Sequence, residues 1–184
     1  MTVSQRVQML PPYLFAEIER KIAARRAAGV DIISLGIGDP DMPTPSHIVD
    51  ALIAGARDPA THQYPSNRGE AAFRLAVAGY YARRYGVDLD AETEIVPLLG
   101  AKEGVAHICA ALLDRGDACL AADPGYPVYA TGPLLADADA VPVSLVPGLA
   151  FQPDLAAIPA AVLERAKMLF VSYPNNPTGA VVED

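Results

Sequence analysis

The strongest constraint on the fold is a regular alternation of strand-like and helix-like segments over the second half of the chain. The apolar runs that predict strands are residues 94–99, 118–122, 140–145 and 168–172. The segments between them that predict helices are residues 101–113, 126–135 and 159–164. Strands that alternate with helices form a mainly parallel sheet covered on both faces. In such an α/β fold, ligands bind beyond the carboxyl ends of the strands.

The N-terminal part of the chain predicts helices joined by loops. Helical patterns cover residues 14–28, 46–57 and 69–85, with Ser46 as the N-cap of the second. Residues 31–35 predict a short strand, and the Gly- and Pro-rich residues 36–45 predict a loop.

Composition excludes several classes of protein. The chain has 184 residues, of which 52% are hydrophobic and 20% charged, as in a globular protein. A net charge of -8 argues against a nucleic-acid surface. No apolar stretch is long enough to span a membrane, and the first ten residues do not read as a secretory signal. Cys109 and Cys119 lie in apolar stretches, which favours core positions in a reducing cytoplasm.

Residues that can carry chemistry follow three of the predicted strands. In residues 99–104, backbone N–H groups at a helix start and the charge of Lys102 favour an anion. In residues 123–129, the ring of Tyr126 can stack on a flat ligand. Residues 175–179 hold amide side chains in a Pro-Gly turn, where an amide can donate to a ligand oxygen. Taken alone, residues 99–104 are better explained as an ordinary tight turn with a solvated lysine, and Tyr126 as a ring packed on the rim of the sheet. Residues 175–179 alone also fit a plain turn, because Asn, Pro and Gly all favour turns.

Other common motifs are absent from the sequence. The Gly100 turn lacks the spacing of a Walker loop, and Asp41 stands where a dinucleotide-binding fingerprint needs its third glycine. The three histidines have no metal-ligand spacing, so no metal site is expected.

Taken together, the order and spacing of the three loops resemble the fold-type-I, class I/II pyridoxal-phosphate-dependent aminotransferases. The matching motifs are Gly-Ala-Lys at 100–102, Pro-Gly-Tyr-Pro at 124–127 and Asn-Pro-Thr-Gly at 176–179. Residues 10–45 and 123–132 resemble the branch that transfers an amino group between glutamate and tetrahydrodipicolinate in lysine biosynthesis. The resemblance implies that family's α/β fold, a pyridoxal 5'-phosphate cofactor, amino-acid and 2-oxo-acid substrates, and a cytoplasmic homodimer with a shared active site.

The resemblance also implies roles for individual residues. Tyr126 would stack on the pyridine ring, and Asn176 would donate to the cofactor's phenolic oxygen. Tyr64 would contact the phosphate of the neighbouring subunit's cofactor. The cofactor contacts it implies are Tyr64, Ala101, Lys102, Tyr126 and Asn176. The substrate contacts it implies are Tyr13, Gly38, Lys102, Tyr126 and Asn176.

Other residues of the family pattern are expected after Asp184, chief among them the Schiff-base lysine. Lys21, Lys102 and Lys167 are the three lysines here, and none lies in the family's Ser-Lys context. The chain also ends just after a strand and its loop, with Glu183 and Asp184 predicted to begin a helix. We therefore expect a truncated fold that is inactive by itself and only marginally stable.

The expected domains follow from the same resemblance. Residues 1–45 would form an N-terminal helical arm and the start of a small domain, and residues 46–184 an incomplete large cofactor-binding domain. Two alternatives stay open. The first is another class I/II aminotransferase, acting on aspartate, alanine or aromatic amino acids, or a carbon–sulfur lyase of this fold. The second is a non-catalytic fragment that keeps the fold without the reaction.

Overall fold

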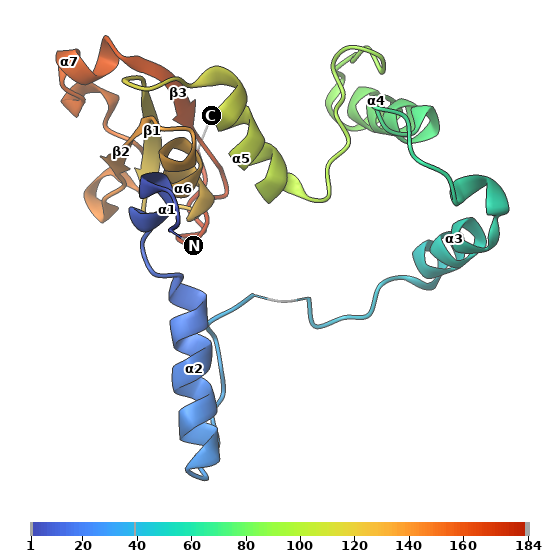
Figure 1. Ribbon diagram of the computed structural model, residues 1–184, viewed down its shortest axis with the longest axis horizontal. Helices are drawn as coiled ribbons and strands as arrows, with labels where there is room; N and C mark the ends of the chain where they lie inside the picture. The colour runs from blue at the N-terminus through green and yellow to red at the C-terminus, as the bar shows by residue number, and fades with distance from the viewer. Residues whose placement is uncertain (1, 39, 183–184) are drawn as a thin grey trace. The chain divides into compact units, whose positions relative to one another are not determined.

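The computed structural model describes residues 2–38 and 40–182 (Figure 1). The chain folds into two compact units, one formed by residues 1–11 and 98–184, the other by residues 12–97. The helical turn predicted at Glu183 and Asp184 lies outside the described residues. The expected domain boundary between residues 45 and 46 stays a prediction.

The first unit contains a three-stranded, fully parallel sheet, as the alternation predicted. Its strands are β1 (Ala118–Asp123), β2 (Asp139–Ser144) and β3 (Ala166–Phe170), in the spatial order β2-β1-β3. The register places Leu120 of β1 opposite Val141 of β2 and Leu169 of β3. The central strand β1 is the most buried, because its first four residues are enclosed. It therefore forms the buried centre of the sheet.

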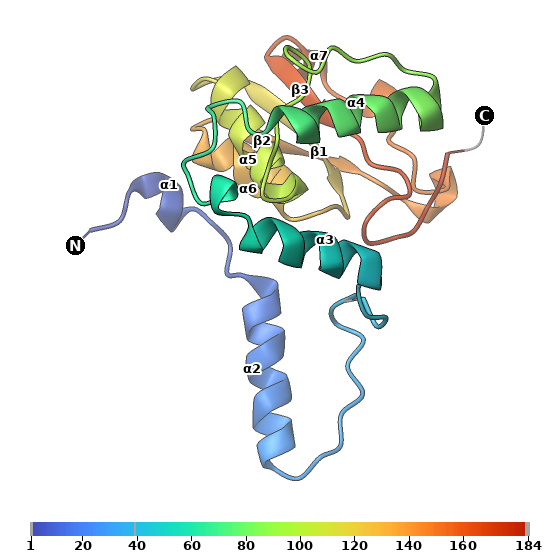
Figure 2. The same ribbon diagram turned by 90° about the vertical axis from the view of Figure 1, so that its right-hand side faces the viewer.

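Two helices cover this sheet in Figures 1 and 2. Helix α5 (Ala101–Leu112) packs on α6 (Val128–Leu135), and α6 in turn contacts β1 and β2. At the crossing of the two helices, a Cβ atom on Gly132 would lie 2.9 Å from the Cys109 sulfur, so this close approach requires glycine. The core beside them consists of Cys109, Leu113, Cys119 and Ala138, with Met168 and Phe170 packed against it.

The remaining elements of the first unit are short. They are α1 (Gln5–Gln8), η2 (Pro147–Leu149), η3 (Leu155–Ala157) and α7 (Ala160–Leu163). Helix α1 belongs to this unit because it contacts α6, where the Arg6 guanidinium donates to the carbonyl of Leu135 at 3.3 Å.

The second unit is helical. It contains α2 (Leu14–Ala27), α3 (Ser46–Arg57), η1 (Pro59–Thr61) and α4 (Ala71–Tyr85). All three predicted helices are therefore present within two residues of their expected bounds. Ser46 is the first residue of α3 and Pro45 its N-cap, so the predicted capping role of Ser46 is wrong. Gly86 ends α4 in the left-handed conformation, a common helix stop.

Two predicted strands, residues 31–35 and 94–99, are wrong: all of these residues are described and none lies in a strand. A strand needs a neighbour to satisfy its backbone N–H and C=O groups, and no described residue pairs with either segment. Their apolar side chains consequently face solvent, with Ile33 88% and Val96 77% exposed. Among the described residues, no helix is both long and apolar enough to cross a membrane.

Candidate functional site

The turn at the start of α5 has the geometry of an anion site. Gly100 is the N-cap residue with φ 120° and ψ 152°, a conformation available essentially only to glycine. No side chain of the N-cap residue covers the first N–H groups of α5, which begin at Ala101. Glu103 fixes the entry to the turn, because its carboxylate accepts a hydrogen bond from the Leu99 N–H at 2.8 Å. The positive end of the helix dipole therefore meets the surface at Ala101 and Lys102.

An aromatic ring lies beside this turn. The Lys102 Nζ atom is 5.4 Å from the centre of the Tyr126 ring. Tyr126 in turn meets Tyr129 edge-on at 5.8 Å, and Tyr129 stacks on Phe170 of β3 at 4.9 Å. The row of rings anchors Tyr126 to the sheet, because Phe170 packs against the buried core.

The Asn-Pro-Thr-Gly turn is tied to the same place. Asn175 is buried, and its Nδ2 donates to the Pro124 carbonyl at 3.3 Å and to the Thr178 hydroxyl oxygen at 2.9 Å. Asn176, which follows it, is exposed. Together with the Lys102–Tyr126 contact, this bond shows that the loops after residues 99, 122 and 172 meet at one edge of the sheet, as predicted.

The other three predicted site residues belong to the second unit. Tyr13 is the N-cap of α2, with its ring 5.6 Å from that of Phe15. Gly38 has open space where a Cβ would lie. Tyr64 is fully exposed (101%) in the loop after η1. The roles of these three residues stay predictions.

The loop that carries Tyr64 is fixed at both ends. Before it, the Thr61 hydroxyl donates to the carbonyl of Gly55 at 2.8 Å, and an imidazole nitrogen of His62 lies 3.0 Å from the carbonyl of Ala56. After it, the Ser66 hydroxyl donates to the carbonyl of Gly69 at 2.7 Å. The exposed ring of Tyr64 therefore lies in a loop with hydrogen bonds at both ends.

Arg74 is a structural residue that sequence reasoning missed. Its side chain is 5% exposed. It donates to the Ala91 carbonyl at 2.8 Å, the Arg68 carbonyl at 3.1 Å and the Glu92 carboxylate at 2.7 Å. The hydrogen bond from Arg74 holds the pKa of Glu92 below its usual range. One feature of the sequence could have indicated a buried, paired arginine: Arg74 is the single charge in the apolar sequence Ala-Ala-Phe-Arg-Leu-Ala. A charged side chain in such a segment is buried only when it is paired.

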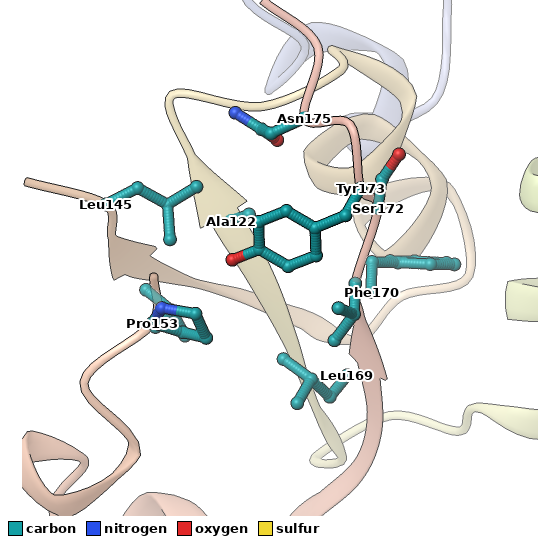
Figure 3. A pocket seen from close by; sticks show the side chains of 10 residues that line it. Ala122, Leu145, Pro153, Leu169, Phe170, Ser172, Tyr173 and Asn175 are labelled. Atoms are coloured by element: carbon teal, nitrogen blue, oxygen red, sulfur yellow. The ribbon is translucent and has the colours of Figure 1, made fainter. Parts of the chain in front are cut away.

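A small pocket adjoins Asn175 on the sheet (Figure 3). Figure 3 shows the ring of Tyr173 among the apolar side chains that line it, and the Tyr173 hydroxyl donates to the Phe151 carbonyl at 3.2 Å. Its empty space is about 260 Å³ even with its opening to solvent, below the ~300–1,000 Å³ of small-molecule sites. We therefore assign it to packing and take the open face at Lys102 and Tyr126 as the candidate site.

The comparisons with known proteins agree with this geometry. Residues 30–184 match the family described as aminotransferase class I and II. The chain belongs to the class I and II aminotransferases, and its parallel sheet flanked by helices is that of fold-type-I members. The resemblance inferred from the three motif loops is thereby confirmed.

Within that family, the curated relatives point to one branch. The chain is 57% identical to the LL-diaminopimelate aminotransferase of Moorella thermoacetica, over 100% of the chain and 47% of that protein. It is likewise 57% identical to the LL-diaminopimelate aminotransferase of Desulforudis audaxviator, over 97% of the chain and 45% of that protein. The chain thus spans about half the length of these relatives.

Two solved structures show the same fold. The apo-BacF structure from Bacillus subtilis has a TM-score of 0.92 and 39% identity, over 100% of this chain and 47% of that one. The Thermus thermophilus aspartate aminotransferase with maleate has a TM-score of 0.89 and 30% identity, over 100% of this chain and 48% of that one.

Proposed function

We propose that this chain is part of a pyridoxal-phosphate-dependent aminotransferase that transfers an amino group between glutamate and tetrahydrodipicolinate, giving 2-oxoglutarate and LL-2,6-diaminopimelate. The observation that carries the proposal is the contact between Lys102 and Tyr126 at the start of α5. It places a cation, the N-terminus of a helix and an aromatic ring beside one another, as recognition of a phosphorylated flat ligand requires. The names of the curated relatives support the choice of substrate.

The described residues fit the cofactor. Its phosphate is a dianion, and α5 offers the positive end of a 12-residue helix behind a glycine that adopts a φ closed to other residues. Lys102 adds a full charge beside that end. When bound, the cofactor supplies an electron sink for the substrate's α-carbon.

Each residue then has a distinct task. The backbone of Ala101 and Lys102 binds the phosphate, and the Lys102 ammonium also reaches the substrate. The Tyr126 ring covers one face of the pyridine and keeps water from it, also touching the substrate. The amide of Asn176 donates to the phenolic oxygen, which favours the deprotonated oxygen. Tyr13 and the backbone of Gly38 bind the substrate.

The lysine that binds the cofactor covalently lies elsewhere in the full protein. Lys21 pairs with Glu17 on α2 at 2.9 Å. Lys167 pairs with Asp117 at 2.8 Å, where β1 and β3 begin, and thus at the opposite end of the sheet from Tyr126. Lys102 serves the phosphate turn. The relatives are about twice as long as this chain, and we place this lysine in the part of the enzyme that the chain does not cover.

The assembly proposed with this function is a cytoplasmic homodimer. Tyr64 supports it, because a fully exposed tyrosine in a loop with anchors at both ends suits a contact with a second subunit's cofactor phosphate. The active site would then need both subunits.

The test uses the full-length protein with added pyridoxal phosphate. We expect an absorbance band from bound cofactor, and amino transfer from LL-2,6-diaminopimelate to 2-oxoglutarate that is faster than transfer from aspartate, alanine or aromatic amino acids. Tyr126→Leu should weaken cofactor binding, whereas Tyr173→Phe, which alters a tyrosine outside the site, should not. Preference for another amino acid would refute the substrate, and failure to bind the cofactor would refute the enzyme class.

A further inference from the structure

Asn175 is one of two buried polar residues among those described, the other being Arg74. It is 3% exposed, and both hydrogens of its side-chain amide have an acceptor: the Pro124 carbonyl at 3.3 Å and the Thr178 hydroxyl oxygen at 2.9 Å. Its backbone is also engaged, because its N–H donates to Ala180 at 2.8 Å and its carbonyl accepts from Gly179 at 2.7 Å. Asn175 is therefore held at four points.

These bonds join the two turns that carry the proposed cofactor contacts. The bonds to Thr178, Gly179 and Ala180 close the turn on which Asn176 sits. The bond to Pro124 connects that turn to the segment on which Tyr126 lies two residues later. The two turns are 51 residues apart in sequence at this bond. Removing the Asn175 amide therefore removes a direct link between the turn of Asn176 and the segment of Tyr126.

An amide is the side chain that this position needs. The two acceptors require two donors from one short side chain, which Asn supplies and which neither Asp nor Ser can supply. An ordinary turn would be satisfied by its backbone bonds alone. The additional long-range bond is what ties this turn to its neighbour.

We propose that Asn175 is a positioning residue for the cofactor. It holds the Asn176 amide where that amide can donate to the cofactor's phenolic oxygen while Tyr126 covers the pyridine ring. This inference rests on the proposed function, because it assumes that Asn176 and Tyr126 contact pyridoxal phosphate. It adds that the relative placement of the two contacts is controlled by one buried amide that itself touches neither cofactor nor substrate.

The experiment uses full-length protein and measures three quantities: the dissociation constant of pyridoxal phosphate, the pH midpoint of the bound cofactor's absorbance change, and the melting temperature. Asn176→Ala should raise the pH midpoint, because the deprotonated phenolic oxygen loses a donor. Asn175→Ala should raise it in the same direction, by roughly half a pH unit, and should weaken cofactor binding severalfold. In the Asn176→Ala background, Asn175→Ala should shift the midpoint no further. Asn175→Ser repeats the measurement with a smaller loss of polarity if the alanine variant does not fold.

Tyr173→Phe is the matched control. Tyr173 lies in the same loop as Asn175, and the substitution removes one side-chain hydrogen bond, to the Phe151 carbonyl, while it leaves the bonds of Asn175 to Pro124 and Thr178 in place. It should lower the melting temperature slightly and leave the midpoint unchanged. The inference is overturned if the Asn175 variants lower only the melting temperature, or if their midpoint shift persists in the Asn176→Ala background. If Asn176→Ala itself shifts nothing, the proposed role of Asn176 fails and the inference fails with it.

Discussion

The ammonium of Lys102 lies 5.4 Å from the centre of the Tyr126 ring. This distance is within the ~6 Å range of cation–π contacts. The two residues come from different places, the first turn of α5 and the loop after β1. Their contact places a positive charge, which can bind a phosphate, next to an aromatic ring, which can stack on a pyridine. Two turns that did not meet could not bind both parts of one ligand.

Lys102→Met should weaken pyridoxal-phosphate binding about tenfold, because it removes a charged partner of the phosphate and keeps an apolar stem. Titration of the full-length protein by absorbance measures the effect. The matched control is Lys21→Met on α2, which breaks only the exposed pair with Glu17 and should leave affinity unchanged. Equal affinities for the two variants would remove Lys102 from the site.

Arg74→Met should destabilise the protein by about 2 kcal/mol, because it leaves backbone carbonyls near Ala91 and Arg68 without their donor. Arg68→Met is the control, since the Arg68 side chain is exposed, pairs with Glu92 and interacts electrostatically with the exposed Asp90. Its loss should cost less than about 1 kcal/mol. Denaturant unfolding of the full-length protein compares them. Similar losses for both variants would show that the buried bonds of Arg74 contribute little.

The lowered pKa of Glu92 predicts how the stability of the fold depends on pH in acid. Hydrogen bonds from Arg74 and then Arg68 lower this pKa from its ordinary value of 4.5. A carboxyl whose folded pKa is lowered stabilises the fold above its ordinary pKa, and the stabilisation is lost as pH falls through the folded value. Glu92→Gln should therefore lower stability at neutral pH and reduce the loss of stability below pH 4.5. Parallel curves of stability against pH for both proteins would contradict this.

The two core cysteines should be unreactive in the folded protein. Burial, and then the nearby Cys109, raise the pKa of Cys119 to about 12, and burial also raises the pKa of Cys109. Thiolate is the reactive form, so a thiol reagent at pH 8 should modify both peptides only after denaturation. Mass spectrometry of the digested protein locates the label. Rapid labelling of either peptide under native conditions would show that this part of the core opens readily.

The sequence predicted the first unit well because its signals are local and mutually consistent. Residues 118–122 are a continuous apolar run between two helical patterns, and they form the buried centre of the sheet. Two of the three motif loops follow from the same order, since β1 and β3 are parallel and put their carboxyl ends at one edge. The loop at residues 99–104 lies at this edge although no strand precedes it, because residues 94–99 form none.

The failures arise where a structure depends on a partner. Residues 31–35 and 94–99 have apolar strand-like sequences, but a strand also needs a neighbouring backbone, which no described residue provides. The bonds of Asn175 to Pro124 and of Arg74 to Ala91 were likewise beyond sequence reasoning. They join segments that are 51 and 17 residues apart, and side-chain hydrogen bonds over such separations leave no periodic pattern.

Gly100 offers a test of the anion turn that isolates backbone from side chain. Its φ of 120° is closed to residues with a Cβ, although a Cβ there would meet nothing within 4 Å. Gly100→Ala should therefore act through backbone strain of about 1–3 kcal/mol, and its relief would turn the first N–H groups of α5 away from the phosphate. We expect cofactor affinity to fall on the order of tenfold and the stability of the fold to fall as well.

The control is Gly116→Ala, because Gly116 also has a positive φ, 97°, and open space around it but precedes β1 at the other end of the sheet. That variant should lose stability without losing affinity for pyridoxal phosphate. Loss of affinity in both variants, in proportion to their loss of stability, would mean that the Gly100 turn supports the fold and has no special part in binding.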